Sequence, residues 1–213
     1  MKGATRAKGH DDRHRMTFAN AERGAWGNTM TDVGTGRGKV VVNRAMSLDG
    51  FIAGPGDEMG WIGDLAPQAE VDSVAAATGA MLVGRRTWDV GDRMKAEDPG
   101  RTDYPFTGPM FLLTHRPLDP PNPNVTVLAG DIGNAVATAL GAAGGKDLEI
   151  LGADVAAQAL RRGLVDEILV YLLPVLLGGG IPFSPAGGVR VDLDPISSAR
   201  SGAATILRFR VRK

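Results

Sequence analysis

Cysteine is absent from the 213 residues, and so is any long apolar run. Without cysteine the chain has no disulfide, no thiolate metal ligand and no cysteine nucleophile. No stretch approaches the ~18 apolar residues of a membrane span, and the first residues lack the apolar core of a secretory signal. Lysine plus arginine and aspartate plus glutamate both number 24, so a nucleic-acid-binding surface is not expected. A cytoplasmic globular protein is the expected class.

The first 38 residues differ in composition from the rest. They hold 7 Lys+Arg against 4 Asp+Glu, a net charge of +3, and only isolated apolar residues. Such a segment buries too little apolar surface to order itself. We therefore predict a disordered basic tail over 1–38 and one folded domain over 39–213. The small charge of the tail argues against nucleic-acid binding through it.

Within the domain, short apolar runs alternate with helical patterns. Strands are predicted at 40–46, 51–53, 80–83, 110–114, 125–128, 148–151 and 167–173, and helices at 66–78, 85–93, 131–143 and 154–162. Asp131 and Asp154 are the expected caps of the last two helices. The alternation predicts parallel βαβ units. Alternating segments at 189–193 and 205–211 predict a C-terminal antiparallel hairpin. The predicted fold class is α/β, with a mainly parallel sheet of about eight strands.

Three loops follow predicted strands and suit phosphate groups. The first is Gly84-Arg85-Arg86-Thr87, which opens a helix and combines cations with free backbone N–H groups. The second is Thr114-His115-Arg116 and the third is Leu151-Gly152-Ala153-Asp154. Each alone reads equally well as an ordinary corner with solvated side chains. Together, at the carboxyl ends of strands in one sheet, they predict a dinucleotide site.

Candidate proton-handling groups cluster after the first strand. Asp49, Asp57, Glu58 and Asp64 surround Trp61 in the sequence, and a carboxyl group against an aromatic wall can have a raised pKa. The alternative is a loop of solvated acids. No nucleophile elbow, phosphate-binding P-loop or GxGxxG motif is present, which argues against a hydrolase triad and a standard dinucleotide fingerprint.

Five segments, in this order and spacing, resemble a known family. They are NRAMSLDGFIA at 43–53, GRRTW at 84–88, GADV at 152–155, GLVDE at 163–167 and PVLLGGG at 174–180. The domain resembles the dihydrofolate reductase-like superfamily, and most closely the reductase half of the bifunctional riboflavin-biosynthesis deaminase–reductase in its stand-alone form. The zinc motif of the deaminase half is absent. The resemblance covers about 40–210 and implies a three-layer α/β/α fold.

The resemblance implies an NADPH-dependent reductase that needs no metal. By match, the cofactor would be held by Ala45, Ile52, Gly84, Arg85, Arg86, Thr87, Thr114, His115, Arg116, Gly152, Ala153, Asp154 and Val155. Among these, Thr114, His115 and Arg116 would take the adenosine 2′-phosphate. The family usually has two adjacent glycines in its second phosphate loop, and here Leu151 occupies the first of those places.

Further matches imply a substrate site and its catalytic groups. Substrate would contact Asn43, Ser47, Asp49 and Trp61, with Asp49 and Asp64 as the catalytic acids. The implied substrate is a small heterocyclic or sugar-linked compound of the 5-amino-6-(5-phosphoribosylamino)uracil type. A pterin reductase and a non-catalytic NADPH-binding protein are the alternatives. The resemblance also implies a homodimer, which would cover the strands near 166–175 and 203–211 if they are exposed sheet edges.

Overall fold

The computed structural model describes residues 38–100, 104–184 and 188–213. The disorder predicted for the N-terminal tail therefore falls almost wholly outside the described residues. The strands are β1 Val40–Ser47, β2 Phe51–Ala53, β3 Thr78–Gly84, β4 Met110–Leu113, β5 Val125–Leu128, β6 Asp147–Leu151, β7 Glu167–Leu173, β8 Ile181–Pro182, β9 Leu193–Ser201 and β10 Ala204–Val211. The helices are the short 3-10 helices η1 Pro55–Asp57 and η2 Gly60–Leu65, and α1 Gln68–Ala77, α2 Arg85–Glu97, α3 Ile132–Gly141 and α4 Ala153–Arg161.

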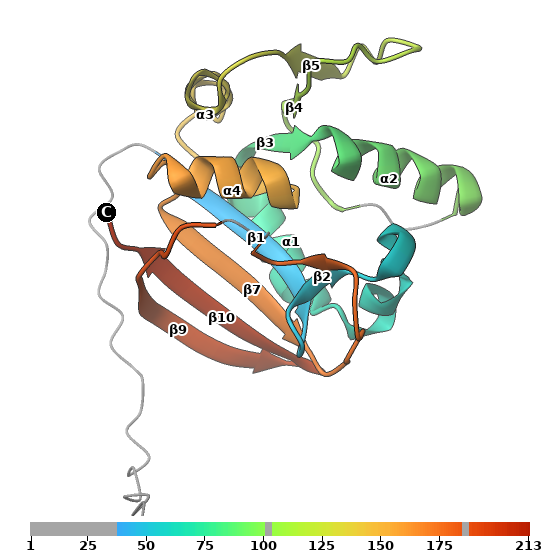
Figure 1. Ribbon diagram of the computed structural model, residues 1–213, viewed down its shortest axis with the longest axis vertical. Helices are drawn as coiled ribbons and strands as arrows, with labels where there is room; N and C mark the ends of the chain where they lie inside the picture. The colour runs from blue at the N-terminus through green and yellow to red at the C-terminus, as the bar shows by residue number, and fades with distance from the viewer. Residues whose placement is uncertain (1–37, 101–103, 185–187) are drawn as a thin grey trace, which may run out of the picture. The chain divides into compact units, whose positions relative to one another are not determined.

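Eight of these strands form the central sheet. Their order is β5-β4-β3-β6-β1-β7-β10-β9, and β2 pairs with β8 in a separate small sheet (Figure 1). The pairs from β5 to β7 are parallel, whereas β10 runs antiparallel to both β7 and β9. The predicted fold class, a mainly parallel sheet with an antiparallel C-terminal hairpin, is confirmed.

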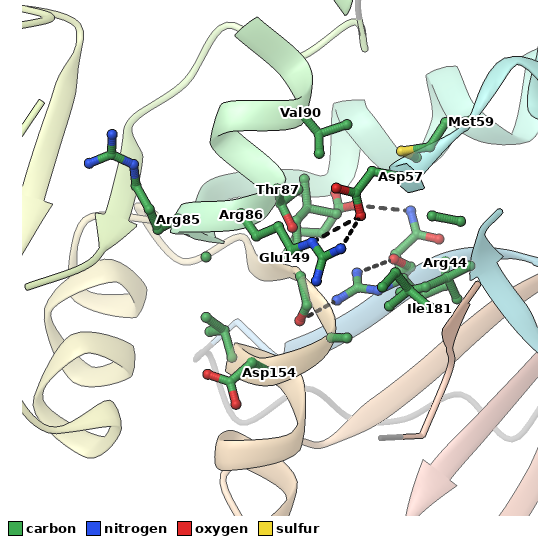
Figure 2. Close-up of a pocket in the computed structure, with 18 of the residues that line it drawn as sticks. Arg44, Asp57, Met59, Arg85, Arg86, Thr87, Val90, Glu149, Asp154 and Ile181 are labelled. Carbon is green, nitrogen blue, oxygen red and sulfur yellow. Dashed lines mark hydrogen bonds and ion pairs between the residues drawn. The ribbon is translucent and has the colours of Figure 1, made fainter. Parts of the chain in front are cut away.

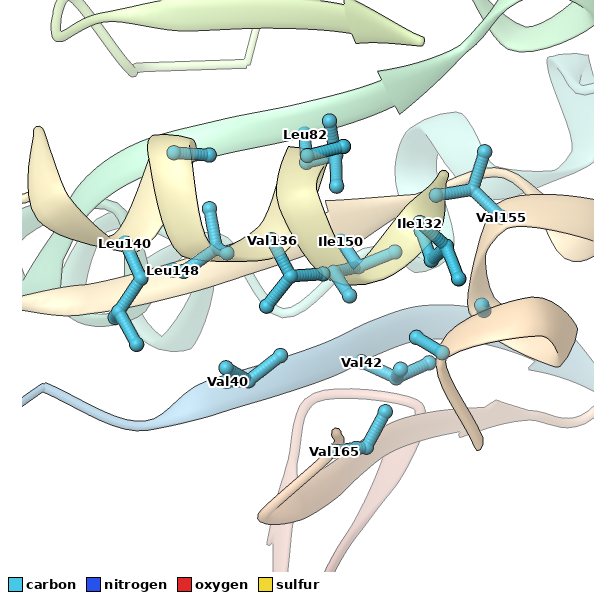
Figure 3. Close-up of a cluster of buried hydrophobic side chains, with 14 of the residues drawn as sticks. Val40, Val42, Leu82, Ile132, Val136, Leu140, Leu148, Ile150, Val155 and Val165 are labelled. Carbon is cyan, nitrogen blue, oxygen red and sulfur yellow. The ribbon is translucent and has the colours of Figure 1, made fainter. Parts of the chain in front are cut away.

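The two faces of the sheet carry separate apolar clusters, as three layers require. Because successive side chains of a strand point to opposite faces, Val40 and Val42 join the cluster beneath α3 and α4, and Val41 joins the cluster toward α1. Figure 3 shows the first cluster, in which Leu148 and Ile150 of β6 are fully buried. The Asp131 side chain caps α3 as predicted, accepting from the Gly133 N–H at 2.7 Å.

Two predictions about the C-terminal strands were wrong. The partner of β10 is β9, Leu193–Ser201, and not 189–193. Most of β9 is exposed and its middle is rich in serine, so pairing with β10 defines this strand and apolar alternation does not. The segments near 166–175 and 203–211 are not sheet edges either, because β7 lies between β1 and β10 and β10 between β7 and β9.

The predicted cap of α4 was also wrong. Gly152 is the N-cap residue, and Asp154 lies in the first turn, where it accepts from the Gln158 side chain at 2.7 Å. The helix begins early because the chain turns at Gly152 with φ of +107°, a conformation that glycine adopts readily.

The core gives the first test. Leu148 is fully buried at the centre of the sheet, so Leu148→Ala should lower the free energy of unfolding by about 2–5 kcal/mol through lost burial and a residual cavity. Urea denaturation measures this. Leu176→Ala is the control: Leu176 is 69% exposed, and its truncation should change stability by no more than about 0.5 kcal/mol. Equal effects of the two changes would contradict the assigned core.

Candidate active site

A cavity of about 1000 Å³ lies at the carboxyl ends of β1, β3, β4 and β6 (Figure 2). Ligands of open α/β sheets bind at this edge. Its lining includes every residue that the sequence predicted to hold the cofactor: Ala45, Ile52, Gly84, Arg85, Arg86, Thr87, Thr114, His115, Arg116, Gly152, Ala153, Asp154 and Val155. Asn43, predicted to contact substrate, also lines it. The fold thus brings the three predicted loops to one cavity.

Two glycines let the first and third loops come together. A Cβ on Gly84 would lie 2.9 Å from the Val155 side chain, and a Cβ on Gly152 would lie 2.8 Å from Thr87 Oγ1. Both distances are too short for a side chain. Because of this close approach, α2 and α4 begin beside each other at the cavity, where their N-termini present unpaired N–H groups and partial positive charge.

Leu151 does not prevent this arrangement. It is the last residue of β6 and lines the cavity, and the positive φ falls on the next residue, Gly152. The conformational freedom that the family places in a glycine pair is therefore available here from Gly152, with Ala153 already helical.

The cations at the cavity have acidic partners. Arg85 Nε lies 2.7 Å from Asp89, and Arg86 Nη2 lies 2.7 Å from Asp57 (Figure 2). Arg116 is more distant, at 3.6 Å from Asp89. The Arg86 and Arg116 side chains are 68% and 71% exposed, so these ion pairs contribute little to stability and are open to exchange with an anion.

The second loop is tied to the first. Thr114 is buried, and its hydroxyl accepts from the Arg116 N–H at 3.1 Å, which shapes a tight turn. Arg85 Nη1 donates to the carbonyls of Arg116 and Pro117 at 3.1 and 2.9 Å. The position of the Thr114–Arg116 turn therefore depends on the helix that begins at Arg85.

Arg44 also lines the cavity, although the sequence motifs gave it no role. Its guanidinium is buried at the cavity and donates to three carbonyls: Asn43 at 2.5 Å, Ile150 at 2.6 Å and Gly152 at 3.1 Å. It joins the end of β6 to the start of α4. Burial lowers the pKa of Arg44 to about 10, and the nearby charge of Glu149 partly offsets this. It remains charged at neutral pH.

A buried polar group forms the floor of the cavity. Glu149 is 1% exposed, and its carboxylate accepts from Asn43 Nδ2 at 3.0 Å, from the Tyr104 hydroxyl at 2.8 Å and from Thr78 Oγ1 at 3.3 Å. Burial raises the pKa of Glu149, and the hydrogen bonds only partly offset the rise. Burial, reinforced by the charge of Glu149, also raises the pKa values of Tyr104 and Tyr171.

Two buried atoms of this floor lack a hydrogen-bond partner of normal geometry. Among the described residues, Asn43 Oδ1 and the Tyr171 hydroxyl have no hydrogen-bond partner although both are buried. Both residues line the cavity. A buried polar atom without a hydrogen-bond partner costs free energy. A bound molecule with a hydrogen-bond donor would satisfy Asn43 Oδ1, and one with a donor or an acceptor would satisfy the Tyr171 hydroxyl.

The structure places three other predicted substrate residues outside the lining. Asp49 is exposed, and its carboxylate accepts from Ser47 Oγ at 2.6 Å and from the Gly178 N–H at 2.7 Å, so it fixes the glycine-rich loop after β7. Hydrogen bonds lower the pKa of Asp49. The bond from the Ser47 hydroxyl has the largest effect, and the bonds from backbone N–H groups add to it. Trp61 packs among the apolar residues toward α1, and its Nε1 donates to the Glu58 carbonyl at 3.3 Å.

The remaining predicted acid, Asp64, lies in η2. The described residues contain no group of three or more histidine, aspartate or glutamate side chains placed to hold a metal ion. They also contain no helix long and apolar enough to span a bilayer.

Solved structures of other proteins superpose on this fold. A riboflavin-biosynthesis protein of Shewanella sp. PV-4 superposes with a TM-score of 0.68 at 24% identity, over 82% of this chain and 99% of the other. A deaminase/5-amino-6-(5-phosphoribosylamino)uracil reductase of Thermotoga maritima gives 0.60 at 16%, over 83% and 57%. Dihydrofolate reductase of Enterococcus faecalis, in complex with NADP(H), gives 0.53 at 15%, over 83% and 98%. No curated protein matches the chain.

These superpositions define a dihydrofolate reductase-like fold. The sequence profile of the RibD C-terminal domain matches residues 38–207. The chain belongs to the RibD C-terminal domain family, the reductase family of riboflavin biosynthesis, which confirms the resemblance seen in the sequence motifs. The chain spans 57% of the bifunctional Thermotoga maritima protein.

The role of Arg44 is testable. Arg44→Met keeps much of the buried volume but leaves three carbonyls without their donor, so the free energy of unfolding should fall by about 3 kcal/mol. Chemical denaturation measures the change. Arg190→Met is the control, since that side chain is 87% exposed and pairs with the exposed Asp192, and it should change the free energy of unfolding by less than about 0.5 kcal/mol. Wild-type stability of Arg44→Met would show that water replaces the guanidinium.

A second test concerns Glu149. Its pKa is raised in the folded protein, so the native state holds this proton more tightly than the unfolded chain does. The protonated Glu149 carboxyl group therefore stabilises the folded protein below its ordinary pKa of 4.5, and this contribution is lost as pH rises through the raised pKa. Wild type should lose stability relative to Glu149→Gln over this interval, as measured by unfolding at a series of pH values. A constant difference would contradict the raised pKa.

Proposed function

We propose that this protein transfers hydride from NADPH to a small heterocyclic or sugar-linked substrate of the 5-amino-6-(5-phosphoribosylamino)uracil type. The observation that carries the proposal is the cavity itself. Two helix N-termini and three cations lie along one part of it, and a buried polar floor with unpaired atoms lies along another. The family to which the chain belongs supplies the reaction class, and the Thermotoga maritima relative carries the uracil reductase activity in its name.

The residues present fit the nucleotide. The Gly84–Thr87 and Gly152–Val155 loops would hold the pyrophosphate with the N–H groups at the start of α2 and α4, which no N-cap side chain occupies. The Thr114–Arg116 turn would take the 2′-phosphate, because a hydroxyl and a guanidinium suit a dianion. Ala45 and Ile52 would flank the nicotinamide. When bound, the nicotinamide supplies the hydride, and the protein supplies orientation and excludes water.

Substrate would occupy the polar floor. Asn43 Oδ1 accepts only, so it selects a ring or exocyclic N–H, and the Tyr171 hydroxyl can serve a carbonyl or a second N–H. Aminopyrimidines and pterins both carry these groups. Asp49 and Asp64, predicted from the sequence as catalytic acids, remain candidates, with Asp49 acting at most through the loop that it fixes.

The direct test has two stages. Calorimetry should detect binding of NADPH, and NADPH oxidation should then be followed with pterins and with ribosylated aminopyrimidines. Oxidation with the pyrimidine supports the proposal, and oxidation with pterins alone identifies a pterin reductase. Binding without turnover on either class identifies a non-catalytic NADPH-binding protein. No heat and no fluorescence change with NADPH would refute the proposal.

Cofactor selectivity gives a sharper prediction. Arg116→Ala should weaken NADPH binding about tenfold, the loss of one charge-assisted contact to the 2′-phosphate, and should leave NADH binding unchanged. Fluorescence titration with both nucleotides measures this. Arg190→Ala, which removes a cation far from the cavity lining, should change neither affinity. Equal losses for the two nucleotides would place Arg116 away from the 2′-phosphate.

The homodimer and the cytoplasmic location stay predictions. The edge strands of the central sheet are β5 and β9, and Leu193 and Ile196 are exposed on β9. Light scattering on the purified protein tests the dimer.

A further inference from the structure

The buried floor of the cavity contains an acid that makes no ion pair within the described residues, although the charge of Arg44 is near it. Glu149 and Glu167 are both almost completely buried, at 1% and 3% exposed. Glu167 binds Lys39 at 2.8 Å and Arg208 at 2.6 Å, as a buried carboxylate usually does. In the described part of the chain, Glu149 has neutral donors as its hydrogen-bond partners, and the nearby Arg44 directs its N–H groups to carbonyls. A neutral glutamine side chain could hydrogen-bond to these groups without the free-energy cost of burying an ionisable carboxyl group. The presence of a carboxyl group here therefore indicates a chemical role.

The position of Glu149 suits the movement of a proton. Its Oε2 lies 2.8 Å from the Tyr104 hydroxyl oxygen, and both side chains line the large cavity. When Glu149 is protonated, its O–H donates to Tyr104 Oη, which leaves the Tyr104 proton available to a ligand. On the other side, Glu149 and Thr78 line a second cavity of about 180 Å³ that lies against α1 and β10. Glu149 therefore stands between the substrate side and a second opening.

We propose that Tyr104 is the proton donor to the substrate and that Glu149 resupplies its proton from the second cavity. The inference rests on the proposed function for its reaction. It concerns residues of this chain that the sequence motifs do not include.

The proton and electron balance is complete. The carbon of a substrate C=N bond receives hydride, with both electrons, from NADPH, which becomes NADP⁺. The C=N π electron pair moves to nitrogen, and nitrogen takes the Tyr104 hydroxyl proton. Tyr104 Oη takes the proton of the neutral Glu149 carboxyl group in the same event. The product carries new C–H and N–H bonds, and the Glu149 carboxylate regains one proton from solvent.

The electrostatics of the floor favour this relay. Burial raises the pKa of both Tyr104 and Glu149, which disfavours a free tyrosinate and favours the protonated form of the glutamate. A relay moves the proton without building charge on the tyrosine. The titratable and charged side chains that face Glu149 or line the cavity behind it are Arg44, Tyr104, Tyr171, Glu70, Asp147 and Arg208.

Other acids near the cavity are less suited to the role. Asp57 is held by Arg86 at 2.7 Å, so its side chain is already engaged by a cation. Asp49 has a lowered pKa and lies outside the lining. An acid that is ionised at neutral pH is a poor proton donor.

The kinetic test compares three variants in the full-length protein. Glu149→Gln and Tyr104→Phe should each lower kcat about 100-fold with NADPH affinity unchanged, the size expected for loss of a general acid. The fall of wild-type kcat at high pH should disappear in Glu149→Gln. Glu167→Gln, a matched change at a buried glutamate outside the cavity, should keep the wild-type pH profile. Melting curves verify folding. A Glu149→Gln enzyme with the wild-type kcat and pH profile would overturn the proposal.

A second measurement does not depend on turnover. Infrared pH titration of the nucleotide-free protein should show a protonated carboxyl band at neutral pH that Glu149→Gln removes and Glu167→Gln retains. Absence of that band would refute the relay even in an active enzyme. A chain that fails to bind NADPH would refute the proposed function, whereas the infrared result decides separately whether Glu149 holds a proton.

Discussion

The guanidinium of Arg44 is the interaction on which the site depends. It lies where β1, β6 and the start of α4 meet, and it donates to three backbone carbonyls at this junction. With those carbonyls fixed, the turn at Gly152 directs the N–H groups of α4 toward the cavity. Thr87 and Gly84 then pack directly against this turn. One buried charge thus sets the relative position of the two helix N-termini.

The cavity combines two regions that differ in charge and in exposure to water. Its rim is exposed and cationic, and its ion pairs are weak enough to be replaced by phosphates. Its floor is buried and holds neutral donors around one carboxyl group. Water screens charges at the rim and is largely excluded from the floor, so the same residue types behave differently a short distance apart. This division matches a cofactor that is highly charged at one end and a substrate recognised by hydrogen bonds.

The sequence predicted the parts that depend on local pattern. Gly84 and Gly152 follow apolar strands and open helices, and both proved essential to the loop packing. The sequence did not identify Glu149 as buried. A single acid in the run Leu148-Glu149-Ile150-Leu151 is as typical of a strand with one solvent-exposed face as of a strand with a buried acid. In the structure both faces of β6 are buried, and Glu149 points away from the face that carries Leu148 and Ile150. Tyr104 lies on a loop that only tertiary packing brings to β6, and strand β9 is defined by its partner.

The ion pair between Arg86 and Asp57 has a consequence for nucleotide entry. Asp57 is held at φ of +66°, on the short segment after β2, and its carboxylate reaches a guanidinium at the start of α2. A phosphate that binds as proposed must displace this carboxylate, so association is an exchange of one anion for another. Added salt weakens the pair that is broken as well as the pair that is formed. The ionic-strength dependence of nucleotide affinity is therefore shallower than the number of arginines at the rim suggests.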